Sequence, residues 1–313
     1  MANILGDSLI KRLRKERGIT QDELCAGLCS KGTLSKYERG VSFPDRWVFK
    51  QLMERLGENP SKYFIDVILP EDRRILDLKE ELKNLLHDES NEGDKKAKEF
   101  IDKLDLDKAF STPENQQFIL TKRATIASRL DDPSTMHNYA YQALLITRPN
   151  FDEHKISSYI LSLDELWLIN QIAVAYILMG VIEKAADIFI ALKMLIEKRF
   201  VEGDDLINIY SSVIYNLSKC FGILEKYEEC IDVCLIGLDW CKRHRNSYHY
   251  PLLLSTKALC LLHIGKLDEG KDVLKKSYAL FMGFERYEEL QLTINYVENE
   301  FGIEINSLEV KIT

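Results

Sequence analysis

Residues 9–40 read LIKRLRKERGITQDELCAGLCSKGTLSKYERG and contain the local signals of three short helices. Gly18 ends the first of them, because glycine readily takes the left-handed conformation that follows many helices. Thr20, with Glu23 three residues later, has the capping-box spacing that begins a second helix. Ser30 is a suitable N-cap for a third helix, which ends at the glycine that closes the stretch. The stretch therefore predicts a compact group of short helices.

Similar signals extend this group beyond residue 40. Pro44-Asp45 opens a fourth helix over residues 46–56, and Asn59-Pro60 opens a short fifth helix. Leucines at helical spacing supply the apolar positions for a small core: Leu9, Leu13, Leu24, Leu28, Leu34, Leu52 and Leu56. We therefore expect a domain of five helices at the N-terminus.

This N-terminal stretch closely resembles the XRE/Cro-type helix-turn-helix family, in which the third helix presents its N-terminal residues to the major groove of DNA. The resemblance implies that four positions read bases and that two flanking side chains contact phosphate. The base-reading positions are occupied by Lys31, Gly32, Thr33 and Lys36, and the phosphate-contacting positions by Gln21 and Arg39. Gly32 departs from the family, whose members usually carry a contacting side chain there.

Two further features agree with this resemblance. Arg14 and Glu38 match a pair that ties the first helix to the third in the family, so their loss should lower stability before specificity. Residues 1–66 contain 12 Lys and Arg against 9 Asp and Glu, whereas the rest of the chain contains 30 against 41. A mildly basic N-terminal domain in an acidic protein is consistent with DNA contact at that end only.

The rest of the chain consists of long amphipathic segments separated by short breaks, and no stretch predicts a strand. The fold class that we expect is therefore all-α. The predicted helices lie near residues 71–89, 94–104, 114–130, 134–147, 164–179, 182–199, 204–222, 225–242, 250–264, 267–281 and 285–300.

Three of these segments repeat one pattern of large and small residues. Each segment ends on a small residue. A large residue stands nine positions before that closing residue, and a second small residue stands twelve positions before it. These triplets are Ala173, Tyr176 and Ala185; Ser218, Phe221 and Cys230; and Ala258, Leu261 and Gly270. Small residues at two fixed positions allow antiparallel helices to approach closely. The pattern looks like the tetratricopeptide repeat. Its spacing exceeds the usual period of about 34 residues, so the helices must be longer than standard, and Glu225 stands where the pattern has a glycine.

A helix-turn-helix domain followed by such repeats resembles the RRNPP quorum-sensing transcription regulators. The resemblance implies a right-handed superhelix of tetratricopeptide-like helix pairs that binds a small secreted signalling peptide in its concave groove. Asn and Gln side chains both donate and accept hydrogen bonds, which suits an extended peptide backbone. Candidate peptide-binding residues on the first helices of the pairs are Trp167, Asn170, Gln171, Asn208, Ser212, Tyr215, Asn216, Lys219 and Ser255.

These expectations divide the chain into three regions. Residues 1–66 form the DNA-binding domain, residues 67–75 form a linker, and residues 76–313 form a sensor and dimerisation domain. The expected partners are a double-stranded DNA operator, a signalling peptide and a second copy of the chain, because two-fold operators are usual for this kind of domain.

Other classes of protein have little support in the sequence. No phosphate-binding loop, nucleophile elbow or metalloprotease motif occurs, so we expect no enzyme, no catalytic residue and no cofactor. The seven cysteines form no CxxC pair, which favours buried thiols over a metal site. No run reaches the ~18 apolar residues of a membrane helix, and no signal peptide precedes the first helix. We therefore expect a cytoplasmic protein without membrane contact.

Two alternatives to a peptide-responsive regulator stay open. The repeats could bind a protein partner instead of a peptide, with DNA binding retained. The helix-turn-helix could also be a vestigial interaction module that binds no DNA. Each polar residue in the predicted groove could equally be ordinary solvated surface.

Overall fold

The computed structural model describes residues 5–63, 70–87, 90–198 and 204–304, and none of these residues forms a strand. The predicted all-α fold is therefore confirmed. The chain divides into two compact units, the first comprising residues 1–180 and 198–203 and the second comprising residues 181–197 and 204–313.

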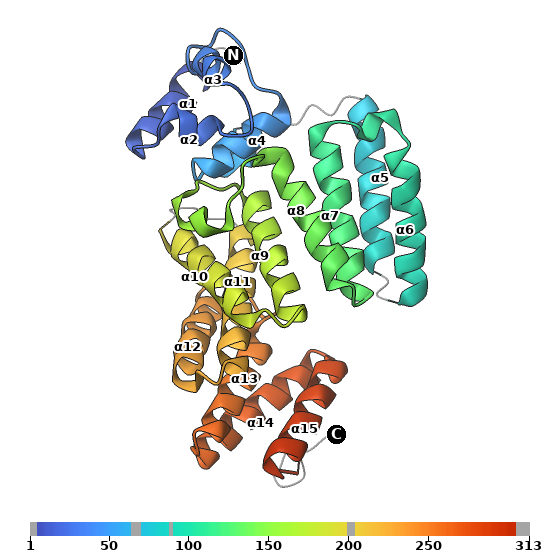
Figure 1. Cartoon of the computed structure of the whole chain (residues 1–313), viewed down its shortest axis with the longest axis vertical. Helices are drawn as coiled ribbons and strands as arrows, with labels where there is room; N and C mark the ends of the chain where they lie inside the picture. Colours follow the sequence, from blue (N-terminus) through green and yellow to red (C-terminus); the bar gives the residue numbers. More distant parts are fainter. Residues whose placement is uncertain (1–4, 64–69, 88–89, 199–203, 305–313) are drawn as a thin grey trace. The chain divides into compact units, whose positions relative to one another are not determined.

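The first unit begins with the predicted group of short helices (Figure 1). These are α1 (Leu5–Glu16), α2 (Gln21–Cys25), α3 (Lys31–Glu38), α4 (Arg46–Arg55) and the single 3-10 turn η1 (Pro60–Lys62). The side chains of Thr20, Ser30 and Asp45 cap α2, α3 and α4 by accepting hydrogen bonds from backbone N–H groups. All the predicted core leucines are buried except Leu28, which is half-buried.

Five longer α-helices and two 3-10 helices complete the described part of the first unit. They are α5 (Pro70–His87), α6 (Asn91–Asp105), η2 (Lys108–Phe110), α7 (Pro113–Arg129), α8 (Pro133–Thr147), η3 (Glu153–Ser158) and α9 (Leu163–Leu178). Successive helices pack against one another from α5 to α9. Pro70 begins α5 rather than interrupting the chain, because proline is well suited to the first turn of a helix. Residues 70–75 of the predicted linker are therefore helical, and residues 67–69 lie outside the described residues.

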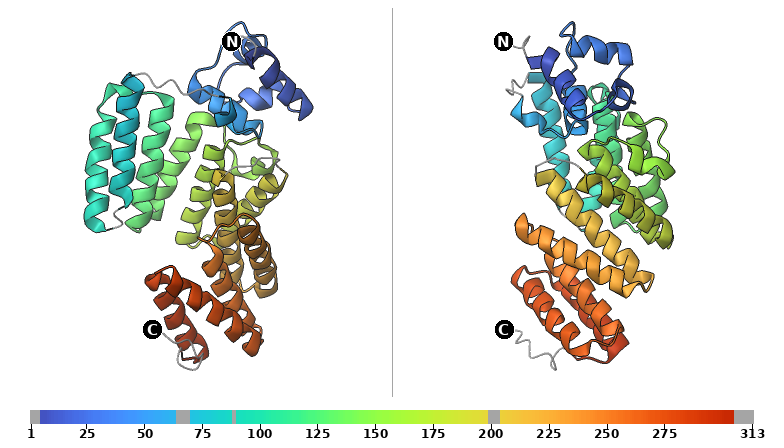
Figure 2. Two further views of the ribbon diagram at one scale, coloured as in Figure 1. Left: turned by 180° about the vertical axis from the view of Figure 1, so that it is seen from behind. Right: turned by 90° about the vertical axis from the view of Figure 1, so that its left-hand side faces the viewer.

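The second unit consists of α10 (Ile182–Glu197), α11 (Asp204–Ile223), α12 (Tyr227–Arg243), α13 (Tyr250–His263), α14 (Leu267–Gly283) and α15 (Tyr287–Phe301). Each helix packs against the next, and Figure 2 shows α12, α13 and α14 as neighbours. The small residues of the repeat lie where these helices meet. The thiol of Cys230 donates to the carbonyl oxygen of Ser218 over 3.1 Å, and a Cβ atom on Gly270 would lie 3.3 Å from the carbonyl oxygen of Ala258. The two pairs α11/α12 and α13/α14 are thus tetratricopeptide-like.

The turns between consecutive helices share one backbone feature. A residue with positive φ stands two positions before the helix that follows, at Asp131, Gly180, Glu225, Gly265 and Glu285. Only two of the five are glycines, although glycine adopts this conformation at the lowest cost. The repeat thus preserves the conformation of the turn where it does not preserve the residue. The winding of the pairs into a right-handed superhelix stays a prediction.

Among the described residues, no helix combines the length and apolar character required to cross a membrane. All seven cysteines are free thiols, and only Cys29 is not fully buried. Thiols in helix interfaces fill space as small apolar groups, as predicted from their spacing.

Candidate functional site

The N-terminal end of α3 carries the predicted base-reading residues on an accessible surface. Lys31, Gly32 and Lys36 are exposed, and Thr33 is partly exposed. The Lys31 ammonium contacts the Asp22 carboxylate over 2.7 Å, but both side chains remain more than half exposed, so water competes with this ion pair. The ammonium groups of Lys31 and Lys36 are therefore available to a polyanion.

Gln21 and Arg39, the predicted phosphate contacts, both hold protein acceptors. Gln21 Nε2 donates to Glu38 Oε2 over 2.8 Å, and Arg39 Nε donates to the carbonyl oxygen of Ser35 over 3.2 Å. Arg39 is exposed and keeps its other donors accessible. Gln21 is half-buried and helps to hold Glu38, a structural role that the sequence did not reveal.

The pair predicted to tie the first helix to the third is present. Arg14 Nη2 donates to Glu38 Oε2 over 3.0 Å, and Arg14 Nε donates to Glu38 Oε1, which makes the contact bidentate. Burial raises the pKa of Glu38, but hydrogen bonds from Arg14 and Gln21 outweigh burial and hold that pKa below its ordinary value. The pair fixes α3 against α1, and Lys31 and Lys36 of α3 remain exposed.

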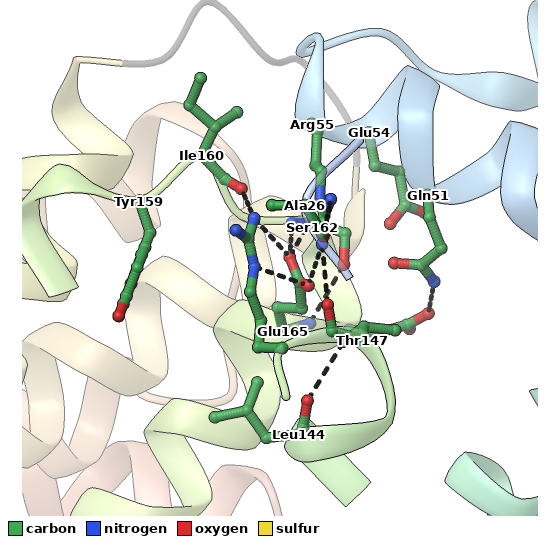
Figure 3. A network of polar contacts seen from close by, with 12 residues as sticks. Ala26, Gln51, Glu54, Arg55, Leu144, Thr147, Tyr159, Ile160, Ser162 and Glu165 are labelled. Atoms are coloured by element: carbon green, nitrogen blue, oxygen red, sulfur yellow. Dashed lines mark hydrogen bonds and ion pairs between the residues drawn. The ribbon is translucent and has the colours of Figure 1, made fainter. Parts of the chain in front are cut away.

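A second charged group, absent from the sequence predictions, joins the helix-turn-helix domain to α8 and α9 (Figure 3). Arg55, the last residue of α4, and Glu165, in the first turn of α9, have fully buried side chains and form an ion pair of 2.5 Å. Glu165 also accepts from Arg148 Nε over 3.0 Å. Burial raises the pKa of Glu165, but the charges of Arg55 and Arg148 outweigh burial and lower that pKa, so the carboxylate is ionised.

Arg55 uses each of its five N–H groups in this environment. Nη1 donates to the carbonyl oxygens of Leu24 at 2.9 Å and Ala26 at 2.7 Å, at the end of α2. Nη2 donates to Glu165 and to the carbonyl oxygen of Thr147, and Nε donates to the other oxygen of Glu165. One guanidinium therefore connects the turn before α3 to the end of α8 and the start of α9.

A more exposed cluster lies beside this network. Asp164 accepts from Lys50 Nζ over 2.7 Å and from Gln51 Nε2 over 2.8 Å, and Glu54 accepts from the backbone N–H of Leu163 over 3.0 Å. The three acceptor contacts join α4 to the N-terminus of α9, where negative side chains are favoured by the helix dipole. The domain thus contacts α9 through hydrogen bonds and ion pairs of polar side chains, although Gln51 Oε1 is buried without a partner among the described residues.

The predicted peptide-binding residues on α9 differ in accessibility. Trp167 and Gln171 are partly exposed, whereas Asn170 is only 1% exposed. The side-chain oxygen of Asn170 is buried and has no hydrogen-bond partner among the described residues. A buried amide oxygen without a partner is costly, and a ligand N–H group would satisfy it.

On α11, Asn208, Tyr215, Asn216 and Lys219 are accessible within the second unit, whereas Ser212 is buried. Asn208 and Lys219 are exposed, and Asn208 Oδ1 accepts from Asn246 Nδ2 over 2.9 Å. Asn216 is partly exposed and donates to the hydroxyl of Ser212 over 3.3 Å. The amide of Asn216 thus retains an acceptor oxygen for another group.

Ser255 faces a neighbouring helix rather than solvent. Its side chain is buried, and its hydroxyl donates to Thr293 on α15 over 3.3 Å. The hydrogen-bonding capacity of the Ser255 hydroxyl is therefore met within the second unit and not by solvent.

Beside Tyr215, the structure gathers residues that sequence reasoning did not select. The ring of His249 lies 5.5 Å from that of Tyr215, and its Nδ1 is 3.0 Å from the hydroxyl of Ser211. Burial, with a smaller contribution from Arg286, lowers the pKa of His249 to about 4. A neutral imidazole in this cluster offers hydrogen-bonding capacity without charge.

No three His, Cys, Asp or Glu side chains are grouped as a metal site in the described part of the chain. The candidate surfaces carry cationic groups on α3, amide and aromatic groups on α9 of the first unit, and amide, hydroxyl and aromatic groups on α11 of the second unit.

Comparisons with known proteins agree with this division. Residues 10–62 match the family model of helix-turn-helix domains. PlcR from Bacillus thuringiensis, solved in complex with the peptide PapR7 and DNA, has a similar fold, with a TM-score of 0.57, 21% identity, and coverage of 91% of this chain and 97% of PlcR. The apo form of PlcR gives a TM-score of 0.56 and 18% identity over 93% of this chain and 99% of PlcR.

A third solved structure, the apo form of RapI, has a TM-score of 0.52 and 12% identity, and the match covers 77% of this chain and 80% of RapI. No curated protein sequence matches the chain at a significant level. The domain match and the shared fold confirm the predicted arrangement of a helix-turn-helix domain followed by a long array of helices. The chain has a helix-turn-helix domain followed by tetratricopeptide-like helices.

Proposed function

We propose that this protein is a cytoplasmic transcription regulator that binds operator DNA through α3 as a homodimer and is controlled by a small peptide. The observation that carries the proposal is the exposed, lysine-bearing N-terminus of α3 within a matched helix-turn-helix domain. The fold shared with PlcR, which was solved with both a peptide and DNA, supports the assignment of a second ligand to the repeats.

DNA binding is tested by replacing the two exposed lysines of α3. K31A/K36A should weaken binding to a duplex by at least about tenfold and reduce the salt dependence, because fewer counterions are released. Fluorescence anisotropy over a range of salt concentrations measures both quantities. K95A/K98A is the matched control, since it removes two exposed lysines of α6 and causes the same change in net charge.

The contrary result is equally clear. If the wild-type protein binds no duplex at low salt, or if the two double variants bind equally well, α3 is not a DNA-reading helix. The domain would then serve as a protein-interaction module, the second candidate function for these residues.

Peptide binding is proposed for the polar surface of α11 within the second unit, and the polar residues of α9 are a separate candidate surface within the first unit. Asn216 carries a partly exposed amide on α11, and Asn170 carries the unpartnered oxygen on α9. An extended peptide supplies N–H and C=O groups that such amides can bind. A library of linear peptides of roughly five to ten residues, measured for their effect on duplex affinity, identifies a ligand.

The variant N216A should weaken the response to that peptide while duplex affinity without peptide persists. N299A, which removes an exposed amide from α15, should respond as wild type does. An equal response of N216A and N299A would exclude Asn216 from the site. A duplex affinity that ignores every peptide would favour the alternative function, in which the repeats dock a protein partner.

Dimer formation is proposed because one small domain contacts too few bases for operator recognition. Sedimentation analysis of the free protein and of its complex with duplex measures the number of chains. One chain per duplex would contradict the proposed homodimer.

A further inference from the structure

We infer that Arg55 and Glu165 are positioning residues for DNA reading: the repeat helix α9 holds, through this buried pair, the turn that places α3. The inference rests on the proposed DNA binding and extends it to residues that touch no DNA. Its basis is the path of contacts from Glu165 through Arg55 to the end of α2.

The first step of the argument is the capping of α2. The last carbonyl groups of a helix have no partner inside it. Helix α2 ends at Cys25. Arg55 Nη1 supplies partners at this end by donating hydrogen bonds to the carbonyl oxygens of Leu24 and Ala26. Ala26 lies outside the helical region there, with φ −49° and ψ 119°, so the chain leaves α2 in a direction that the guanidinium fixes. Ser30, which caps α3, follows four residues later.

The second step is the anchoring of Arg55 itself. A guanidinium on a side chain with several rotatable bonds positions a turn only if it is itself held. Glu165 holds it in a bidentate contact, and the carbonyl oxygen of Thr147 takes a further N–H group. Glu165 is in turn fixed by the backbone N–H of Ser162, over 2.7 Å, as part of a capping box at the start of α9.

The third step concerns charge. Two guanidinium groups, those of Arg55 and Arg148, share the single carboxylate of Glu165. Loss of either arginine leaves Glu165 with one guanidinium, so the remaining pair is balanced. Loss of Glu165 leaves two cations in a buried site, which is costly. The two arginines therefore form a matched pair for experiment, because only Arg55 contacts α2.

The experiment uses the full-length protein and a duplex that the wild-type protein selects from a pool of random sequences. Affinity is measured for this duplex and for an unrelated duplex of equal length, at several salt concentrations. R55M should lower the ratio of specific to non-specific affinity about tenfold, since the reading helix loses its placement. Non-specific affinity and its salt dependence should not change, because phosphate contacts dominate them.

R148M should lower the melting temperature but keep the wild-type ratio, since Arg148 does not reach the turn. E165Q should lower the ratio as R55M does, because a neutral amide holds the guanidinium less strongly. All measurements are made below the melting temperature of the least stable variant. If R55M does not fold, R55K replaces it: lysine keeps the charge but cannot span both carbonyl groups and Glu165.

Several results would overturn the inference. A wild-type ratio in R55M, or in R55K when that variant is used, would show that placement of α3 does not depend on this guanidinium. A loss in R148M equal to that in R55M would show a general effect of stability. A loss in R55M without any in E165Q would confine the role of Arg55 to its own domain. If the wild-type protein selects no sequence, the proposed function fails, and this inference fails with it.

Discussion

The carbonyl oxygen of Thr147 lies only 1.9 Å from the position that a Cβ atom on Gly27 would occupy. Gly27 stands in the turn between α2 and α3 and has a φ of +74°, and Thr147 is the last residue of α8. Glycine is therefore required twice, for its backbone conformation and for the space that it leaves. The turn of the helix-turn-helix motif rests directly on the backbone of a repeat helix.

The substitution G27A should move the turn away from α8 and lower the free energy of unfolding by at least about 2 kcal/mol. The matched control is G18A, because Gly18 has a φ of +66° but no atom within 4 Å of its Cβ position. That control carries only the conformational cost, about 1 kcal/mol. Denaturant unfolding of the full chain measures both, and equal losses would show that the turn is free to shift.

The pair of Arg14 and Glu38 predicts an acid-dependent contribution to stability. Burial raises the pKa of Glu38, yet Arg14 and Gln21 hold it below its ordinary value. The ionised carboxylate is thus favoured by folding, and this contribution is complete above the unfolded pKa of about 4.3 and is lost as pH falls through the lower folded pKa.

We expect E38Q to lower the free energy of unfolding at pH 7 by about 1–3 kcal/mol, so the variant should unfold at a lower denaturant concentration. The difference from wild type should shrink as pH falls from about 5 to 3. Denaturant midpoints at several pH values measure it. Duplex affinity at neutral pH should change less than in K31A/K36A, and a larger loss in E38Q would show that Glu38 acts in recognition and not in stability.

Local signals explain how much of the DNA-binding domain could be predicted. Capping residues such as Thr20 and Ser30 act within three residues, so the sequence alone reveals them. The pair of Arg14 and Glu38 came from a family resemblance, because nothing local links residues 24 positions apart. Arg55 and Glu165 are 110 positions apart, and Glu165 is locally explained as a capping-box residue, so its second partner gave no signal.

The candidate peptide site shows a second limit of sequence reasoning. Side chains on one helix can be assigned to a face by periodicity, but their burial depends on the helices that pack beside them. Ser255 was predicted to face a ligand and instead donates to Thr293, a contact that requires the position of α15. The packing of α11 and α13 brings His249 to Ser211 and Tyr215, and no local pattern in the sequence indicates this contact.

His249 predicts a loss of stability in mild acid. Burial and Arg286 lower its pKa to about 4, whereas the unfolded chain has the ordinary value of about 6.5. The unfolded state therefore binds more protons between these values, and stability falls as pH decreases from about 6.5 to 4. The full effect is at most about 3 kcal/mol.

The variant H249Q keeps a polar side chain but does not titrate in this range. Its melting temperature should decline less than that of wild type between pH 6.5 and 4, as differential scanning calorimetry measures. Carboxylates that titrate in the same range contribute equally to both proteins and cancel in the comparison. Parallel declines would show that His249 is protonated as easily in the folded chain as in the unfolded one.

Glu225 predicts a gain in stability on substitution. It occupies the position in the turn between α11 and α12 that Gly265 occupies between α13 and α14, and its φ is +59° against +78° for the glycine. A non-glycine residue in the left-handed region costs about 1–2 kcal/mol, whereas glycine adds about 0.5–1 kcal/mol of backbone entropy to the unfolded chain. The conformational term is the larger one, so E225G should stabilise the protein by about 0.5–1 kcal/mol.

The reverse change, G265A, introduces the same strain where no atom lies within 4 Å and should destabilise. Denaturant unfolding of both variants measures the two signs, and a loss of stability in E225G would mean that the side chain of Glu225 contributes more than its backbone costs.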